Sequence, residues 1–476
     1  MPDRSVFLTL SPVFVNIRAM NEDYQRIQDS MREYYESGAT LSVDARLRTL
    51  RQLKQLIRSW EERLNEAIWL DLNKSRFENY ETEIGLTQAE ISHLIRHLRK
   101  WAKPERVSTP LAHFPSRSLI LKQPKGVVMV MSPWNYPIQL ALVPLACALA
   151  AGCCVLLKPS RYSENVSRTL KEMFSSGFDP GLVSVVEGGH QANTELLQLH
   201  WDHIFFTGSP NVGRIVMEAA AKNLTPVTLE LGGKSPCIID GSVDMKLAAT
   251  RLAWGKFLNA GQTCVAPDYL LIDRKYVQSF KTEFRKAAGR MYPGLLEAKD
   301  LGKIINRKHF DRLMGLLEGQ KTVFGGEGDA EALKIAPTLL EDVDPESPVM
   351  KEEIFGPVLP MIAYDSFEEA VSFIRKRPKP LALYIFSRNR EHIRTVQERL
   401  TYGGGCVNDV VVHLSNPSMP FGGVGESGMG SYHARQGFNT FTHEKSILSK
   451  GLWLDLPVRY APYDNRLVRL LRLLMK

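Results

Sequence analysis

Cys264 is placed in this sequence where a nucleophile would be useful. It stands in the segment N-A-G-Q-T-C-V-A-P (Asn259–Pro267), just after a predicted helix and before a predicted strand. A loop on a rigid scaffold leaves a thiol accessible, and a thiolate can form covalent intermediates with electrophilic carbon. The alternative is a buried apolar side chain, which is the common role of a free cysteine. We assign that role to the other five cysteines, Cys147, Cys153, Cys154, Cys237 and Cys406.

Two other polar residues could act on a carbonyl group. Glu230 lies between two leucines in L-E-L-G-G-K-S-P (Leu229–Pro236), so burial should raise the pKa of its carboxyl group toward the range of a general base. Asn135 has the only side-chain amide in the proline-bracketed turn S-P-W-N-Y-P, where it could donate a hydrogen bond to a developing oxyanion. The alternatives are a half-buried glutamate paired with a lysine, and an asparagine that only shapes the turn.

Two further segments could bind an anionic ligand, and a third gathers groups of several kinds. In F-F-T-G-S-P-N-V-G (Phe205–Gly213), Gly208 and Ser209 follow a buried strand and precede a helix, whose first N–H groups attract anions. In V-L-L-K-P-S, Lys158 ends an apolar strand at the carboxyl edge of a predicted parallel sheet, where α/β folds bind ligands. The segment E-E-I-F-G-P-V (Glu352–Val358) joins acids, an aromatic ring and a Gly-Pro turn. A helix-capping Ser209 and a solvated Lys158 are the simpler interpretations.

The elements that must position these residues follow an alternating pattern. Strand and helix signals alternate from residue 126 onward, which predicts parallel sheets with helices on both faces. The expected strands are Gly126–Met131, Cys153–Leu157, Val183–Val186, His203–Thr207, Ser235–Ile239, Tyr269–Ile272 and Ala382–Phe386. The expected helices are Tyr136–Ala151, Ser163–Phe174, Ala192–Gln198, Gly213–Lys222, Met245–Leu258, Tyr276–Arg290, Phe367–Arg375 and Glu391–Leu400. We therefore predict an α/β fold with two domains that meet near residue 230.

Composition and charge exclude several classes of protein. The chain has 476 residues, 44% hydrophobic and 24% charged, which indicates a globular protein of more than one domain. The net charge of +8 is spread thinly with no dense basic block, so we expect no nucleic-acid partner. Six cysteines without a C-x-x-C pair indicate a reducing compartment and no zinc site. The uncharged stretch Pro137–Leu157 is broken by Pro144 and Gly152, which favours a buried helix and strand over a membrane span.

The N-terminal third has a different character. Before Met20 we expect a disordered extension, since Pro12 interrupts the apolar run that a signal peptide would need. Residues 21–101 are predicted to be helical, because apolar residues recur at spacings of three and four. Residues 106–123 are extended and rich in proline, which predicts a hairpin arm that leaves the main body.

Taken together, in this order and spacing, the motifs resemble the aldehyde dehydrogenase superfamily over roughly residues 21–463. Details similar to its class 3 branch, which includes fatty aldehyde dehydrogenases, are W-N-Y-P, V-N-D-V-V-V-H (Val407–His413), P-F-G-G-V-G-E-S-G-M-G-S-Y-H (Pro420–His433) and L-D-L-P-V-R-Y-A-P-Y (Leu454–Tyr463). The resemblance implies oxidation of medium- or long-chain aliphatic or aromatic aldehydes to carboxylic acids, with NAD or NADP as cofactor.

The resemblance also implies a role for each motif. Cys264 would attack the aldehyde to give a thiohemiacetal and then a thioester, while the Asn135 amide and the Cys264 N–H hold the oxyanion. Glu230 would activate the water that hydrolyses the thioester, and no metal is expected. The implied cofactor contacts are Glu353 on the nicotinamide ribose, Phe355 beside the ring, Lys158 on the adenosine ribose, and Gly208, Ser209 and Gly213 as the pyrophosphate turn.

The family fold implies a division of the chain. Residues 1–105 and 124–229 would form the helical N-terminal part and a Rossmann-type dinucleotide-binding domain, and residues 230–425 the α/β catalytic domain. Residues 106–123 and 426–450 would form a protruding oligomerisation arm, followed by a C-terminal segment, 451–476. We expect a homodimer in the cytoplasm, with contact at a membrane surface as an additional prospect.

Arg161 departs from the family pattern. The usual motif is K-P-S-E, whose glutamate binds the ribose 2′-hydroxyl, whereas this chain has K-P-S-R. A guanidinium matches phosphate geometry, so we predict good use of NADP. The alternative, weighted equally, is that Arg161 points into solvent.

The C-terminus and the rival functions complete the expectations. Leu467, Leu470, Leu471 and Leu474 share one helical face and basic residues another, so this short helix could lie in an anionic membrane interface. It could instead cover the active-site mouth or contact a dimer partner. Rival functions are transfer of the thioester to coenzyme A, disfavoured by Glu230, and a catalytically silent binding or structural protein, disfavoured by the intact Cys264, Glu230 and Asn135.

Overall fold

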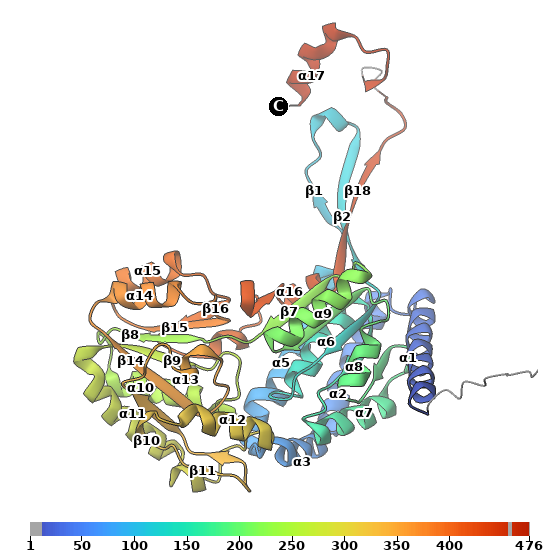
Figure 1. The fold of residues 1–476 in the computed structure, drawn as a ribbon. Coiled ribbons are helices and arrows are strands. Elements are labelled where there is room, and N and C mark those ends of the chain that lie inside the picture. The colour runs from blue at the N-terminus through green and yellow to red at the C-terminus, as the bar shows by residue number, and fades with distance from the viewer. Residues whose placement is uncertain (1–11, 456–458, 476) are drawn as a thin grey trace, which may run out of the picture.

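The computed structural model describes residues 12–455 and 459–475, which form two large sheets with flanking helices, a two-stranded sheet and a long arm (Figure 1). The first helix, α1, spans Pro12–Glu36. The expectation of a disordered chain up to Met20 is therefore wrong from residue 12 onward, because proline is tolerated in the first turn of a helix. Residues 1–11, the rest of that prediction, lie outside the described residues.

Helices form the N-terminal segment, as predicted. They are α2 (Val43–Ser59), α3 (Glu61–Leu72), α4 (Arg76–Asn79), a π-helical turn (Tyr80–Ile84) and α5 (Gly85–Trp101). The leucines of α2 that follow the helical period, such as Leu50 and Leu53, are buried. Helices α2 and α5 pack against α6 (Gln139–Ala151), which in turn packs on the first sheet.

The first sheet has the strand order β17-β7-β6-β3-β4-β5. Its parallel strands are β3 (Val127–Met131), β4 (Cys154–Lys158), β5 (Val183–Val185), β6 (His203–Gly208) and β7 (Val227–Leu231). A two-residue strand, β17 (Gly428–Met429), adds to β7 in the antiparallel direction. The chain runs outward in opposite directions from β3 and β6, so the crevice at the carboxyl ends of these two strands is where such sheets bind ligands.

The second sheet has the strand order β10-β13-β14-β9-β8-β15-β16, and only β10 is antiparallel to its neighbour. Its strands are β8 (Pro236–Ile239), β9 (Tyr269–Asp273), β10 (Lys321–Phe324), β13 (Thr338–Glu341), β14 (Val358–Tyr364), β15 (Ala382–Phe386) and β16 (Gly404–Val407). The helices α10 (Met245–Phe257), α11 (Val277–Met291), α14 (Phe367–Arg375) and α15 (Arg390–Arg399) accompany it. Each expected strand and helix is present to within three residues at either end.

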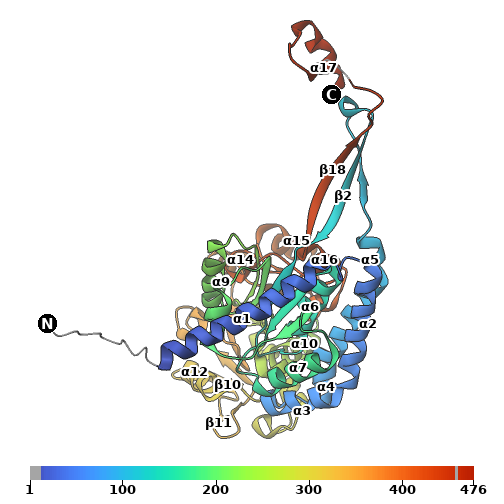
Figure 2. The ribbon, with the colours of Figure 1, turned by 90° about the vertical axis from the view of Figure 1, so that its right-hand side faces the viewer.

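The arm is a three-stranded sheet that stands away from the two large sheets (Figure 2). Its central strand, β2 (Ser116–Pro124), pairs with the short β1 (Glu105–Val107) and along its whole length with β18 (Thr442–Lys450). Before β18, the helix α16 (Ala434–Thr440) packs on α6. The division of the chain into domains stays a prediction.

The C-terminal helix α17 (Val468–Leu474) packs on the turn Leu111–His113 at the far end of the arm (Figure 1). It therefore does not cover the active-site mouth of its own chain, which was one of the expected alternatives. Of the four leucines expected on one face, Leu467 is exposed and Leu471 half-buried. The side chains of Leu470 and Leu474 lie outside the described ones.

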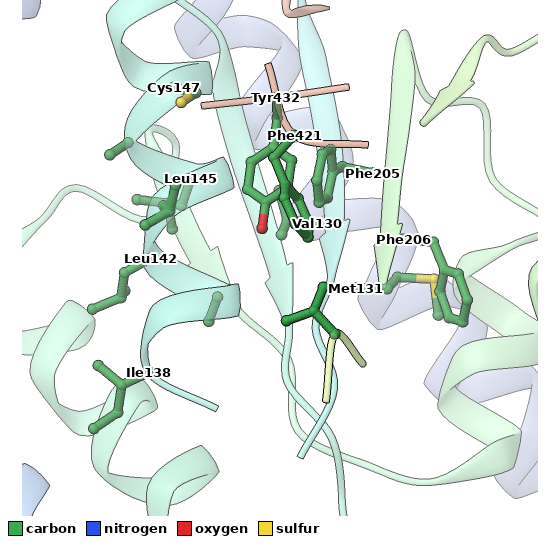
Figure 3. Packing of buried hydrophobic residues seen from close by; sticks show 14 of the residues in the cluster. Val130, Met131, Ile138, Leu142, Leu145, Cys147, Phe205, Phe206, Phe421 and Tyr432 are labelled. Carbon is green, nitrogen blue, oxygen red and sulfur yellow. The ribbon is translucent and has the colours of Figure 1, made fainter. Parts of the chain in front are cut away.

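The core lies between the first sheet and α6, a helix that is buried along its whole length (Figure 3). Leu142 and Leu145 of α6 belong to the same buried cluster as Phe205 and Tyr432. The predicted assignment of residues 137–157 to a buried helix and strand is confirmed, and none of the helices that the structure describes could span a bilayer. Cys147, Cys153, Cys154 and Cys237 are buried as expected, but Cys406 is only half-buried because β16 is an edge strand.

Candidate active site

A cavity of about 350 Å³ lies between the two sheets. Segments at the carboxyl ends of β3, β6 and β7 line one side, and segments before β9, β14 and β15 line the other. Seven of the ten predicted site residues line this cavity: Asn135, Gly208, Ser209, Glu230, Cys264, Glu353 and Phe355. Lys158, Arg161 and Gly213 do not line it, although they lie in elements around the same edge of the first sheet.

A second cavity, of about 260 Å³, adjoins the first and has mainly apolar walls. Its apolar lining residues include Leu86, Trp254, Leu258, Val265, Val411, Val412 and Leu414. Cys264, Leu140, Phe421 and Tyr432 line both cavities. The thiol of Cys264 therefore stands where the two cavities meet.

The loop that presents Cys264 has an unusual backbone. A short 3₁₀ turn, Leu258–Gly261, follows α10, and within it Asn259 and Ala260 have left-handed φ angles of 52° and 51°. Gly261, at φ 73°, lies so close to Gly356 that a Cβ atom there would be 2.1 Å from its carbonyl oxygen. This close approach requires glycine and fixes the loop before Cys264 against the loop before β14.

The Cys264 thiol is half-buried and faces two carboxyl groups. Burial raises the pKa of this thiol to about 12, and the negative charges of Glu353 and Glu230 add to the effect. The expected alternative of a fully buried, inert cysteine is not found at this position. At that pKa the thiol is protonated at neutral pH.

Glu230 lies on β7 and is only 3% exposed. Neither of its carboxyl oxygens has a hydrogen-bond partner among the described residues, so the alternative of pairing with a lysine is not found. Burial raises the pKa of this carboxyl group well above its usual range, in the direction that the flanking leucines predicted. A neutral carboxyl group in the cavity can accept a proton only after it has ionised.

Asn135 lies in the turn between β3 and α6 and is 3% exposed. Its side-chain Nδ2 donates a hydrogen bond to the main-chain oxygen of Gln262 at 3.1 Å. Its own carbonyl accepts from Asn259 Nδ2 at 2.8 Å. The turn from the first sheet and the Cys264 loop from the second are thus hydrogen-bonded to each other.

Glu353 projects over a glycine in the same cavity. A Cβ atom on Gly232 would lie 2.0 Å from Glu353 Oε2, so only glycine allows this approach. Burial raises the pKa of Glu353 to about 8, and the charge of Asp268 adds to the effect. Phe355, at φ 53°, meets the ring of Trp134 edge-on with centroids 5.4 Å apart.

The glycine-rich turn after β6 has the features expected of a helix start. Ser209 Oγ accepts a hydrogen bond from the Val212 N–H at 3.5 Å and caps α9 (Pro210–Lys222), so the capping interpretation is confirmed. Gly213 lets α9 pack closely on β7, because a Cβ atom there would lie 2.7 Å from the Leu231 side chain. The turn therefore offers backbone N–H groups at the start of a helix that begins beside the cavity.

Lys158 and Arg161 lie at the end of β4. Lys158 is 3% exposed and donates hydrogen bonds to the carbonyls of Pro159 and Gly188 at 2.8 and 2.7 Å. The solvated interpretation of Lys158 is therefore wrong, and burial lowers the pKa of its amine to about 8. Arg161 is exposed, with its guanidinium carbon 5.2 Å from the ring centroid of Tyr162.

Several cavity residues were not predicted as site residues. Thr207, Trp134, His309 and Arg312 line the first cavity, and Tyr432 lines both. Thr207 could have been predicted, because its hydroxyl directly precedes the turn at Gly208 and Ser209. The sequence around His309 and Arg312 contains no feature that predicts a place in the cavity. No cluster of metal-ligating side chains occurs among the residues that the structure describes.

The residues present fit a bound dinucleotide. The buried Thr207 Oγ1 has no hydrogen-bond partner within the described part of the chain, and it lies beside the glycine turn. The carboxyl group of Glu353 overhangs Gly232 at the opposite wall. These groups can accept and donate hydrogen bonds along the first cavity, while the second cavity remains for an apolar ligand.

Comparisons with known proteins identify relatives of this chain. A model described as the aldehyde dehydrogenase family matches residues 11–447. The chain is 44% identical over 450 residues to 4,4′-diaponeurosporen-aldehyde dehydrogenase of Staphylococcus aureus, covering 94% of this chain and 98% of that protein. It is 44% identical over 441 residues to the dimeric NADP-preferring aldehyde dehydrogenase of Canis lupus familiaris, covering 92% and 97%. A solved structure of the substrate-bound state of Staphylococcus aureus AldH superposes with a TM-score of 0.93 at 42% identity, covering 95% and 99% of the two chains.

Proposed function

The chain belongs to the aldehyde dehydrogenase family, and we propose that Cys264, Glu230 and Asn135 perform its NAD(P)-dependent oxidation of aldehydes to carboxylic acids. The family resemblance of the motifs is confirmed. One observation supports the assignment of residues above all others: Cys264 is shared by a cavity that fits a dinucleotide and a cavity with apolar walls. A nucleophile at that junction can hold a substrate carbon beside a cofactor.

In the first step the Cys264 thiol loses its proton, to an ionised Glu230 carboxylate or to water, and the sulfur adds to the aldehyde carbon. A thiohemiacetal forms, and the carbonyl oxygen becomes an oxyanion. The second N–H of the Asn135 amide stays available for this oxyanion, since the first is held by Gln262. The Cys264 backbone N–H is the other donor that we assign.

When bound, the nicotinamide ring of the cofactor accepts the hydride that converts the thiohemiacetal to a thioester. The protein positions this ring with Glu353, assigned to the ribose, and with Phe355, assigned to the ring face. The domain division follows the same logic. Among the described residues, we assign 12–105 and 124–229 to the helical N-terminal part and the dinucleotide-binding domain, 230–425 to the catalytic domain, and 106–123 and 426–450 to the arm.

The last step is hydrolysis of the thioester by water. Once ionised, Glu230 accepts a proton from the water as it attacks, and its raised pKa makes the carboxylate a stronger base than an exposed glutamate. Its position in the cavity supports hydrolysis over transfer of the acyl group to coenzyme A. If addition of coenzyme A leaves the ratio of carboxylic acid to acyl-coenzyme A unchanged, hydrolysis is supported.

The second cavity supports a substrate with an apolar tail, either a medium- or long-chain aliphatic aldehyde or an aromatic one. Its walls bury hydrocarbon, which favours substrates by roughly 25 cal/mol per Å² of apolar surface removed from water. The experiment is a series of aldehydes of increasing chain length, with formation of NADH or NADPH as readout and Cys264→Ser as control. We expect kcat/KM to rise with chain length, and no activity in Cys264→Ser.

Arg161 and Lys158 are assigned to the adenosine end of the cofactor. The exposed guanidinium of Arg161 is free to reach a 2′-phosphate, although no ion pair from it is formed with another described residue. On that basis we propose that this chain uses NADP well as a cofactor. Gly208, Ser209 and Gly213 shape the turn that approaches the pyrophosphate.

A homodimer is supported by the arm. β18 stands at the open edge of the three-stranded sheet β1-β2-β18, and such an edge pairs readily with another chain. A relative in dog is named as dimeric. Ser446→Pro, which removes one N–H from β18, should shift the sedimentation of the protein toward the monomer.

Contact with a membrane surface is proposed for the end of the arm. Trp453 is 72% exposed and Leu111 68% exposed, and α17 adds the exposed arginines Arg469 and Arg472. Apolar and basic groups together suit an anionic lipid interface. Co-sedimentation with anionic liposomes should be lost in a chain that ends at Tyr463, whereas equal binding would contradict the proposal.

The six free cysteines support a reducing, cytoplasmic location.

A further inference from the structure

A fully buried ion pair lies beside the catalytic turn, outside both cavities. Lys74 Nζ is 2.7 Å from Glu83 Oε1, and neither side chain is exposed at all. Lys74 comes from the link between α3 and α4, and Glu83 from the π-helical turn Tyr80–Ile84. π-Helical turns are rare and occur often at functional sites. Neither residue was expected to have a role from the sequence.

The pair contacts the turn that holds Asn135 at two places, at Asn135 itself and where the turn meets α6. Lys74 Nζ donates to the Asn135 carbonyl at 3.2 Å. Glu83 Oε2 accepts from the N–H groups of Ile138 at 2.7 Å and Gln139 at 3.2 Å. Because α6 begins at Gln139, the carboxylate stands at the start of that helix, where negative charge is favourable. The second half of the turn, from Asn135 to the start of α6, is therefore held by two side chains that are paired with each other.

The same turn is fixed to the Cys264 loop on its other side. The ammonium group of Lys74 lies 3.9 Å from the ring centroid of Tyr136, and the Tyr136 hydroxyl is 2.5 Å from Thr263 Oγ1. The Asn135 side chain reaches the Gln262 carbonyl. Movement of the turn would therefore move the Asn135 amide relative to the loop that presents Cys264.

The choice of a buried ion pair at this place is informative. Well-packed apolar residues often stabilise a core as well as a buried ion pair does, so such a pair is weak evidence for a role in stability. A positive charge at the Asn135 carbonyl and a negative charge at the start of α6, by contrast, fix the directions of the backbone groups that they contact. One N–H of the Asn135 amide is held by Gln262, and the direction of the second depends on how the turn is held.

We propose that Lys74 and Glu83 are positioning residues for the oxyanion-binding amide of Asn135. This inference rests on the proposed function of Asn135, and the pair contacts the turn rather than substrate. Loss of the pair should lower kcat, because a misaligned donor weakens contacts made in the transition state. It should leave KM for the cofactor unchanged, because neither residue lines the cofactor cavity.

The test is a double-mutant cycle with Asn135→Ala. The combined variant Lys74→Met/Glu83→Gln replaces the pair with neutral groups of similar size, and Glu83→Gln alone keeps an oxygen that can accept from Ile138 and Gln139. We expect kcat to fall about 10- to 100-fold in the combined variant, which loses both charges. We expect a fall of about 3- to 10-fold in Glu83→Gln, which loses only one. In the Asn135→Ala background, each should lose less than about threefold, because the amide that the pair positions is absent.

Lys281→Met is the matched control. The ion pair of Lys281 with Glu341 joins α11 to β13, and neither residue lines either cavity. Lys281→Met should leave kcat unchanged even if the unfolding temperature falls.

Three results would overturn the proposal. An equal loss of kcat with and without Asn135 would show a general structural effect. Normal kcat in folded variants would show that the pair positions nothing, and failure of both variants to fold would make the pair a requirement of folding instead. Normal kcat in Asn135→Ala alone is a different outcome, which refutes the proposed function of Asn135 itself.

Discussion

The side-chain amide of Asn135 donates a hydrogen bond to the main-chain carbonyl of Gln262, two residues before Cys264, at 3.1 Å. Asn135 follows a strand of the first sheet, and Gln262 precedes a strand of the second. The two groups assigned to bind the oxyanion are therefore fixed relative to each other across the cavity. Donors that are aligned before the reaction need no reorganisation when charge develops, and such preorganisation is often the largest single contribution to catalysis.

Asn135→Ala should lower kcat by about 10²–10³, the usual loss for one oxyanion donor. Asn135→Asp, which is nearly isosteric but accepts rather than donates, should lose at least as much. The measurement is steady-state kinetics with a saturating aldehyde, together with cofactor binding as a check on folding. Wild-type kcat in Asn135→Ala would remove this residue from the mechanism.

Glu230→Gln should be more resistant to heat than the wild type, and the difference should widen as the pH rises above about 4.5 until the folded-state carboxyl group ionises. The pKa of the buried Glu230 carboxyl is raised, so the folded state retains a proton that the unfolded state releases above about pH 4.5. The wild type therefore loses stability as pH rises through this window, whereas the amide does not titrate. Thermal unfolding midpoints at four pH values measure the effect, and a constant difference between the two proteins would contradict it.

The Cys264 thiol should react slowly with iodoacetamide in the cofactor-free protein. Because the pKa of this thiol is raised to about 12, only a small fraction is thiolate at neutral pH, and the rate should increase close to tenfold per pH unit from pH 7 to 9. Glu353→Gln should raise the rate at pH 9, where the Glu353 carboxyl, with a pKa of about 8, is charged, and change it little at pH 6. A rate that levels off below pH 8 would show a thiol that is already ionised.

Arg161→Glu should shift cofactor preference from NADP toward NAD by at least about tenfold in the ratio of kcat/KM values. A glutamate repels a 2′-phosphate and can bind a 2′-hydroxyl, whereas a guanidinium does the reverse. Arg214→Glu, on the exposed face of α9, is a control for the change of charge. The same ratio in wild type and Arg161→Glu would mean that Arg161 points away from the cofactor.

Sequence reasoning worked where a local pattern determines structure. The apolar run before Lys158 forms β4, and Glu230, which lies between two leucines, is buried. Both could be predicted because the spacing of apolar residues and the adjacent side chains determine strand formation and burial. Pro12 gave a wrong prediction, since the same residue can interrupt an apolar run or begin a helix.

Long-range features could not be predicted in this way. Lys74 is a lysine in a polar segment, and only the folded chain shows that it is fully buried against Glu83 and Asn135. Tyr432 lines both cavities although it follows β17, a two-residue strand that has no sequence period. The position of α17 at the end of the arm could not be predicted either. It depends on the pairing of β2 with β18, which lie more than 300 residues apart in the sequence.

The most direct measurement is the intact mass of Glu230→Gln after it is mixed with an aldehyde and NADP. Because thioester formation does not need Glu230 but hydrolysis does, we predict about one reduced cofactor per chain in a rapid burst, and an acyl adduct on the peptide that contains Cys264. The same mixture with Cys264→Ser/Glu230→Gln should show neither the burst nor the adduct. Steady turnover by Glu230→Gln at the wild-type rate, or an adduct on a different cysteine, would contradict the account.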